Sequence, residues 1–158
     1  MSTDVHINPA QLARSAGCSC LKVRQLSRRI SQHFDHFVCS AGLKTTQYSL
    51  LAQIVNFGPL RPIELAGRME LDASTLTRNL KPLVANGWVV VGPGTDGRSR
   101  LVAATDAGRH KWTQAKREWK RAQLALNEHL GEARLQRLHA LLDECLGVMR
   151  TAADLPEE

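Results

Sequence analysis

Apolar and polar side chains fall on opposite faces of the segment from residue 73 to residue 86. The apolar residues recur at helical spacing and are Leu76, Leu80, Leu83 and Val84. At ~3.6 residues per turn, Ser74, Arg78 and Lys81 project from the opposite side of the same helix. The pattern therefore predicts a helix with one buried face and one face that offers hydroxyl and cationic groups.

The same periodicity, together with residues that begin and end helices, predicts five further helices. Gly42 is placed to end the first as a C-cap, and Gly58-Pro59 breaks the second. The candidate N-caps are Thr45 or Thr46, Asp72 and Thr105. The helices are expected from Cys18 to about Ala41, from Thr45 or Thr46 until Gly58-Pro59, from Pro62 to Met69, from Ala73 until Asn86-Gly87, from Thr105 until Gly131, and after Gly131.

A short hairpin is expected after the fourth helix. Residues Trp88 to Val91 are aromatic or β-branched and strand-like, and Arg100 to Ala104 form the partner strand across the loop from Gly92 to Gly97. Two short helices, a tight turn and a Gly-rich hairpin, in that order, are typical of a winged helix-turn-helix. The predicted fold is mainly α, with a small β-hairpin wing.

The last two helices carry apolar residues at alternating spacings of 3 and 4, as coiled-coil seams do. The two seams are Trp112, Ala115, Trp119, Ala122 and Leu126, and Leu135, Leu138, Leu142, Cys145 and Met149. A winged-helix core needs little beyond residues 45 to 105 for its own packing, so we expect a helical dimerisation layer and a two-fold homodimer. The alternative is that both seams pack within one chain.

Composition agrees with one folded domain that has helical extensions. The chain has 158 residues, of which 43% are hydrophobic, enough to bury a core. The segments expected are an N-terminal arm (1–17), a dimerisation helix (18–44), the winged helix-turn-helix core (45–108) and C-terminal dimerisation helices (109–158).

The charge balance narrows the class of partner. A formal net charge of +6 at pH 7 favours polyanions such as DNA without requiring them. No apolar run approaches the ~18 residues of a membrane span, and residues 1 to 16 lack the features of a signal peptide. We therefore expect a cytoplasmic protein with no membrane partner. Its four cysteines include no CxxC pair and do not predict a disulfide framework.

Four linked segments resemble the MarR family of bacterial transcription regulators. They are GLKTTQYSLL (42–51), GPLRPIELAGRM (58–69), LDASTLTRNLKPLVANGWV (71–89) and DGRSRLVAATDAG (96–108). The resemblance implies a homodimer of winged helix-turn-helix subunits in which the helix from Ala73 enters the major groove of double-stranded DNA at an inverted repeat. It also implies that the wing presents Arg98 to the minor groove, with Asp96 orienting that side chain.

These considerations select the candidate DNA-binding residues. On the fourth helix they are Ser74, Thr75, Thr77, Arg78 and Lys81, and on the wing Asp96, Arg98 and Arg100. Each also has a simpler interpretation, as a solvated surface charge or as a hydroxyl favoured near a helix start. Three positions depart from the family pattern. Arg61 stands where a capping Thr or Ser is common, and Glu70 where the turn often has Gly. Pro82 is expected to interrupt or bend the helix from Ala73.

Two hypotheses address regulation. Cys18 and Cys20 begin the first helix, where the positive end of the helix dipole favours thiolate, so either is a candidate oxidant sensor; buried apolar packing of the cysteines is the simpler interpretation. Two residues apart on a helix, they point in opposite directions and cannot bridge to each other within it. The competing hypothesis is an aromatic or phenolic small-molecule effector held beside Trp112 or Trp119. A metal site at His33, His36 and Cys39 is disfavoured, because only neighbouring members share a helix face.

Other functional classes have little support. Residues Gly92 to Gly97 satisfy GxGxxG, but a dinucleotide fingerprint opens a helix, whereas a strand is expected here. No catalytic constellation is discernible, so we expect no enzyme activity and no cofactor. The remaining alternative is a winged-helix protein-interaction module that lacks DNA recognition.

Overall fold

The computed structural model describes residues 17–94, 97 and 99–153. Its helices are α2 (Ser19–Val38), the 3₁₀ helix η1 (Cys39–Ala41), α3 (Thr45–Phe57), α4 (Pro62–Met69), α5 (Ala73–Ala85), α6 (Asp106–Leu130) and α7 (Glu132–Ala153), and its strands are β1 (Val89–Pro93) and β2 (Arg100–Ala104). Of the expected N-terminal arm, residues 1–16 lie outside the described part. No described helix is long and apolar enough to span a membrane.

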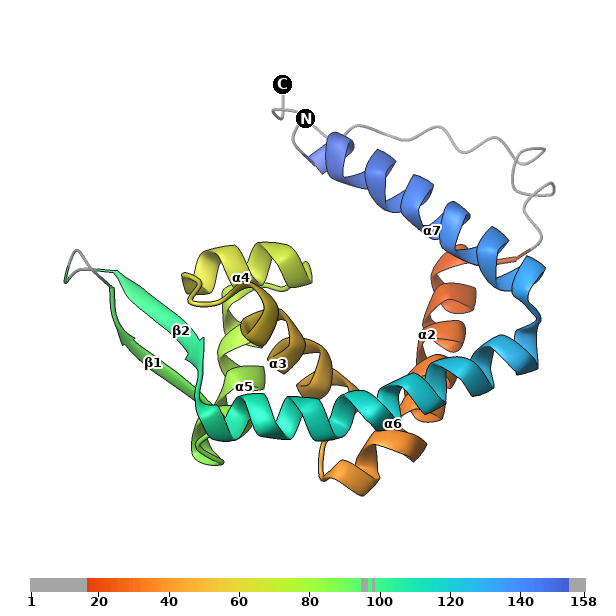
Figure 1. Ribbon diagram of the computed structural model, residues 1–158. Coiled ribbons are helices and arrows are strands. Elements are labelled where there is room, and N and C mark those ends of the chain that lie inside the picture. The colour runs from red at the N-terminus through yellow and green to blue at the C-terminus, as the bar shows by residue number, and fades with distance from the viewer. Residues whose placement is uncertain (1–16, 95–96, 98, 154–158) are drawn as a thin grey trace, which may run out of the picture.

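Helices α4 and α5 form the helix-turn-helix, α3 packs against both, and the β1–β2 hairpin projects beside them as the wing (Figure 1). The hairpin is antiparallel, with Val89 opposite Ala104 and Val91 opposite Val102. Leu60 exchanges backbone hydrogen bonds of 3.1 and 2.8 Å with Val102, which ties the wing to the α3–α4 connection. The predicted winged-helix fold, mainly α with a small hairpin, is confirmed.

Three of the predicted helix boundaries rest on identifiable caps. The Asp72 carboxylate accepts the backbone N–H of Thr75 at 2.7 Å, and Thr105 Oγ1 accepts that of Gly108 at 3.0 Å. Gly42 follows η1 with φ of 73°, the left-handed conformation that glycine adopts without strain. Short polar side chains and one glycine thus set the ends of α5, α6 and η1.

The start of α3 differs from the prediction. The N-cap is Lys44 rather than Thr45 or Thr46. The backbone N–H of Thr45 donates to the Asp35 carboxylate at 2.6 Å, and that of Lys44 donates to the Gln47 side chain at 2.9 Å. Because Asp35 comes from α2, local sequence signals do not reveal this cap.

The seam on α6 is buried inside a single chain. Ala115 and Ala122 are fully buried and Leu126 is nearly so. Ala115 belongs to the winged-helix core, whereas Ala122 and Leu126 pack with Phe34 of α2 and Leu135 of α7. For α6, the alternative of packing within one chain is therefore the one observed.

The seam on α7 is buried only at its beginning. Leu135 is 7% exposed, but Leu142 is 40% and Met149 is 70% exposed. Further exposed large apolar residues on α2, α6 and α7 are Leu21, Val23, Leu26, Leu124, Leu141, Leu146 and Val148. In Figure 1, the start of α7 lies beside α2 at the end of the molecule away from the wing, and the rest of α7 runs back toward the end of α4. Folding of one chain therefore leaves substantial apolar surface exposed on α2 and along α7.

The first turn of α6 lies against the base of the wing too closely to admit a side chain. A Cβ at Gly108 would lie 2.0 Å from the carbonyl oxygen of Trp88. Thr105 strengthens the same junction, because its hydroxyl donates to the Gly87 carbonyl at 2.7 Å and its backbone N–H to the Trp88 carbonyl at 3.1 Å. Helix α6 is therefore fixed directly to the start of β1.

Candidate nucleic-acid interface

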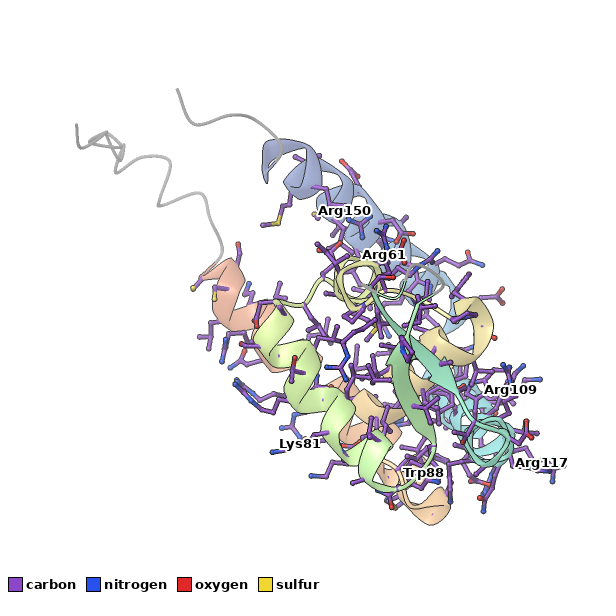
Figure 2. All side chains as sticks on the ribbon, turned by 90° about the vertical axis from the view of Figure 1, so that its left-hand side faces the viewer. Arg61, Lys81, Trp88, Arg109, Arg117 and Arg150 are labelled. Carbon is purple, nitrogen blue, oxygen red and sulfur yellow. The ribbon has the colours of Figure 1, made fainter. Side chains whose placement is uncertain are left out.

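Helix α5 has the two faces that its sequence predicts. Leu76, Leu80 and Leu83 are buried against the core. On the other side, the candidate residues Ser74, Thr77, Arg78 and Lys81 are exposed, and Thr75 is half-buried. Figure 2 shows Lys81 projecting from α5 away from the body of the molecule. The exposed face is long enough to bring hydroxyl and cationic groups to one surface.

Asp72 organises the hydroxyl groups at the start of α5. Its carboxylate accepts the hydroxyls of Ser74 and Thr75 at 2.6 and 2.7 Å, in addition to the Thr75 backbone N–H. These hydrogen bonds, first the one from Ser74, hold the pKa of the Asp72 carboxyl far below its usual value. Asp72 is therefore an ionised acceptor at neutral pH. The sequence predicts Asp72 as the N-cap of α5, but it does not reveal the hydrogen bonds from both hydroxyls to this carboxylate.

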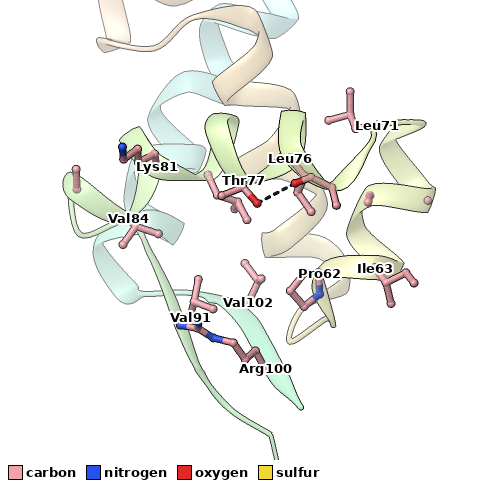
Figure 3. Close-up of a pocket in the computed structure, with 15 residues that line it drawn as sticks. Pro62, Ile63, Leu71, Leu76, Thr77, Lys81, Val84, Val91, Arg100 and Val102 are labelled. Carbon is pink, nitrogen blue, oxygen red and sulfur yellow. Dashed lines mark hydrogen bonds between the residues drawn. The ribbon is translucent and has the colours of Figure 1, made fainter. Parts of the chain in front are cut away.

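The third hydroxyl of α5 is also engaged within the helix. Thr77 Oγ1 donates to the backbone carbonyl of Ala73 at 2.8 Å (Figure 3). Pro82 lies within α5, which nevertheless continues as one helix to Ala85. The expected interruption at Pro82 does not end the helix. Arg78 and Lys81 lie before the proline, and their spacing along α5 puts them on the same helical face as Ser74.

An apolar groove of about 1070 Å³ adjoins this face (Figure 3). It lies between α4, α5 and the hairpin and is lined in part by Ile63, Thr77, Val84 and Val91. Val84 was assigned to the buried stripe, but it is 42% exposed and lines the groove. On a helical projection it lies about 75° from the centre of the leucine stripe, a position at the edge of the buried face rather than within it.

The wing is described only in part. Arg100 is the first residue of β2, is exposed and lines the same groove as Val91. Asp96 and Arg98, the other two wing candidates, lie outside the described residues. The strand that follows the GxGxxG segment is β2, as expected, and the segment does not open a helix.

Helix α6 carries basic residues, among them Arg109 and Arg117, that are separate from the exposed face of α5. Figure 2 shows Arg109 and Arg117 on the opposite side of the molecule from Lys81. Both are exposed. Even the first turn of α6, represented by Arg109, does not extend the surface that Lys81 occupies.

All four cysteines are exposed, and none forms a disulfide bond. Their expected burial as small apolar residues is therefore wrong for the single chain. Cys18 is the N-cap of α2 and has extended backbone dihedrals, so the argument from helical geometry against a bridge to Cys20 does not apply to it. His33 lies between α2 and α6, with Nε2 2.8 Å from the Ala122 carbonyl oxygen. Among the described residues, no three His, Cys, Asp or Glu side chains gather as a metal site.

Trp112 and Trp119 lie where α6 crosses α3. Trp119 stacks on Tyr48 with a centroid distance of 5.9 Å and contacts Phe34 at 5.7 Å. Burial raises the pKa of the Tyr48 hydroxyl, and hydrogen bonding from the Trp112 side chain opposes that shift. The buried Trp112 Nε1–H has no well-formed hydrogen-bond partner among the described residues. The two predicted pocket residues therefore share one aromatic cluster.

Comparison with known proteins supports the class that the fold and the α5 surface define, a winged helix-turn-helix regulator. The MarR family model matches residues 43–99. An uncharacterized HTH-type transcriptional regulator of Bacillus subtilis, YwoH, is 30% identical over 93 residues, which are 59% of this chain and 68% of the relative.

Solved structures extend the comparison to most of the chain. The Mycobacterium tuberculosis transcriptional regulator MosR, in complex with DNA, is 31% identical and has a TM-score of 0.72, covering 85% of this chain and 99% of MosR. A mutant Escherichia coli MarR complexed with operator DNA shares the fold at 23% identity, with a TM-score of 0.72 over 78% of this chain and 90% of that one.

The chain belongs to the MarR family. Members of this family are transcription regulators and not enzymes. The family model covers residues 43–99. The four segments that resemble the family span residues 42–108, and the winged helix-turn-helix from α3 to β2 spans residues 45–104.

Proposed function

We propose that the protein is a homodimeric transcriptional repressor that binds an inverted-repeat operator. Helix α5 enters the major groove, and the wing contacts the minor groove. The observation that carries the proposal is the exposed face of α5, where Ser74, Arg78 and Lys81 stand opposite the buried leucines. The proposed DNA contacts are Ser74, Thr75, Thr77, Arg78 and Lys81 on α5, and Asp96, Arg98 and Arg100 on the wing.

A second copy of the chain is the proposed occupant of the apolar surface on α2 and α7. Residues such as Leu26, Leu142 and Met149 stay exposed in the single chain, and their burial in a dimer is favourable. Residues 18–44 and 109–158 then contribute to dimerisation, and 45–108 bind DNA. Two-fold symmetry would set the two α5 helices one turn of DNA apart, ~34 Å.

The test is a gel-shift titration of the purified protein against its own upstream region, with an unrelated duplex of equal length as control. Specific retardation at moderate salt is the expected result. The alternative, a winged-helix interaction module, has no need for the exposed cationic face of α5. Equal affinity for both duplexes, or none for either, would favour that alternative.

The wing proposal predicts that Arg98→Ala weakens operator binding. If the guanidinium contacts phosphate, the slope of log K against log salt should fall by about one phosphate equivalent; if it enters the minor groove, preference for A·T tracts should decline. Asp96→Ala should cause part of the same loss, because it leaves Arg98 less well oriented. If both variants bound the operator like the parent protein at every salt concentration, the wing assignment would be refuted.

Two routes are proposed for release from DNA, thiol oxidation and binding of a small aromatic molecule. For the first, Cys18 and Cys20 are exposed at the start of α2, beside the proposed dimerisation surface. We predict that mild peroxide lowers operator affinity of the parent protein, because oxidised sulfur at this position repacks the dimer layer and changes the spacing of the two α5 helices.

The variant with both Cys18→Ser and Cys20→Ser decides between the two routes. It should stay on DNA after peroxide treatment in the same gel-shift assay, whereas the single variant Cys145→Ser serves as a control and should respond like the parent. Release of the double variant by peroxide would refute a switch at this pair.

The second route places an aromatic or phenolic effector beside Trp112 and Trp119. The Trp112 Nε1–H supports it, because this group is buried beside the Tyr48 hydroxyl without a well-formed hydrogen bond, and a buried donor gains from an acceptor such as a phenolate or carboxylate oxygen. A ligand there would contact both the winged-helix core and α6.

A further inference from the structure

The hydroxyl groups of α5 share one property that decides what they can bind. Each of them donates its proton within the protein: Ser74 and Thr75 to the Asp72 carboxylate, and Thr77 to the Ala73 carbonyl. A hydroxyl has one proton and two acceptor lone pairs. Toward an outside molecule, these hydroxyls are therefore acceptors only.

The direction of these three hydrogen bonds, which we call their polarity, is fixed by the acceptor atoms. A carboxylate and a carbonyl oxygen cannot donate, so in each of the three hydrogen bonds the hydroxyl must be the donor. Asp72 engages both of its oxygens, at 2.6 Å with Ser74 and 2.7 Å with Thr75. Ser74 is exposed while Thr75 is half-buried, so Ser74 is the hydroxyl of this pair available to a base edge.

We propose that Asp72 sets the hydrogen-bond polarity of α5, so that Ser74 accepts from a base that carries an amino group in the major groove. Such bases are adenine, through N6, and cytosine, through N4, whereas guanine O6 and thymine O4 are acceptors and oppose it. Thr77 has the same polarity one turn further along. The inference rests on the proposed entry of α5 into the major groove.

The same polarity argues against phosphate as the partner of these hydroxyls. Phosphate oxygens are acceptors, so they gain nothing from an acceptor-only hydroxyl beside an ionised carboxylate. Phosphate and guanine contacts then fall to donor groups, which on this face are Arg78 and Lys81. Along α5, the hydrogen-bond acceptor at Ser74 therefore comes before the hydrogen-bond donors of Arg78 and Lys81.

The first experiment measures base preference with every base pair of an operator half-site substituted in turn. The parent protein should prefer adenine or cytosine over guanine or thymine at one position on one strand, by about five- to tenfold in affinity. Ser74→Ala should remove this preference at that position and leave the others. Ser40→Ala, which removes an exposed hydroxyl that donates to the Phe37 carbonyl, is the matched control and should change nothing.

A chemical counterpart identifies the amino group itself. Where the preferred base is adenine, purine lacks only the 6-amino group; where it is cytosine, 2-pyrimidinone lacks only the 4-amino group. Either analogue should lower affinity of the parent about as much as Ser74→Ala does. Combining analogue and variant should add little further loss, because both remove the same hydrogen bond.

Asp72→Ser tests the role of Asp72 while keeping a residue that caps helices. Without a carboxylate to receive its proton, Ser74 can donate as well as accept, so guanine or thymine should become acceptable at the same position. Circular dichroism and sedimentation should show unchanged helix content and assembly. Thr77→Ala should remove a preference for adenine or cytosine at the position that Thr77 contacts. Its matched control is Thr113→Ala, which removes a hydroxyl with the same bond to the carbonyl four residues earlier and should change nothing.

The outcomes separate this inference from the proposed function. Absence of sequence-specific binding by the parent protein would overturn both. Specific binding by the parent with an unchanged preference in both Ser74→Ala and Asp72→Ser would overturn the polarity inference alone. Preference for guanine or thymine at a Ser74-dependent position would overturn it as well, since that requires a donating hydroxyl.

Discussion

Replacing Arg78 with alanine is expected to weaken operator binding by about 1 to 3 kcal/mol and to relax the preference at one base pair of each half-site. Arg78 is exposed on α5, nearly opposite the buried face formed by Leu76, Leu80 and Leu83. From that position its guanidinium can bond guanine O6 and N7 together, a geometry that lysine does not match. Arg78→Lys should therefore retain affinity better than base preference.

Fluorescence anisotropy titrations with the parent operator and its single-base variants provide the measurement. Arg117→Ala is the matched control, since it removes an exposed arginine from the side of the molecule away from Lys81. It should alter affinity little and base preference not at all. If Arg78→Ala bound every duplex as the parent does, Arg78 would be a solvated surface charge.

Deletion of residues 132–158 is expected to yield monomer or aggregate and to abolish high-affinity binding to the inverted repeat. The deletion removes α7, whose exposed apolar residues include Leu141, Leu142 and Val148. It also uncovers apolar surface on α6 and α2 that Leu135 and Leu138 help to cover. Sedimentation equilibrium across a concentration range distinguishes these states.

A point variant isolates assembly from folding of the subunit. Leu142 is 40% exposed in the single chain, so Leu142→Asp should leave the subunit folded while opposing burial of this surface in a dimer. Ala140→Asp, at an exposed position on the other side of the same helix, controls for the added negative charge, because it changes the net charge by the same one unit. A stable dimer formed by both the deletion and the point variant would place the interface elsewhere.

Local signals in the sequence were sufficient to predict most of the fold. Asp72 and Thr105 are short polar residues directly before segments with apolar residues at helical spacing, and both cap helices as predicted. The 3.6-residue repeat of Leu76, Leu80 and Leu83 identified the buried face of α5. In each case the cause lies within one or two turns of the residue, which is the range over which periodicity and capping act.

Contacts between distant segments could not be predicted in this way. The cap of α3 depends on Asp35 of α2, and burial of the α6 seam depends on Phe34 of the same helix. A seam of small and apolar residues has the same appearance whether it faces a neighbouring helix or a second chain. Val84 shows a related limit, because a residue at the edge of an apolar stripe is buried only if a neighbouring element covers it.

The candidate site was predicted by residue type but not by hydrogen-bond direction. Ser74, Thr75 and Thr77 were selected as polar groups on α5, whereas the donors and acceptors among them follow from bonds to Asp72 and Ala73. The exposure of the four cysteines was also missed. Cysteine on an apolar stripe of a helix is commonly buried, and only the position of the stripe relative to other helices shows otherwise.

The close packing of Gly108 on the Trp88 carbonyl makes α6 a lever arm. Its 25 residues span about 37 Å at 1.5 Å per residue, from the wing base to the helices that carry the exposed apolar surface. If the far end is held, a tilt of about 5° displaces the wing base by about 3 Å, close to the ~3.4 Å rise between base pairs. A rotation of a few degrees at the far end of α6 is thus enough to displace the wing, at the near end, by about the distance between neighbouring base pairs.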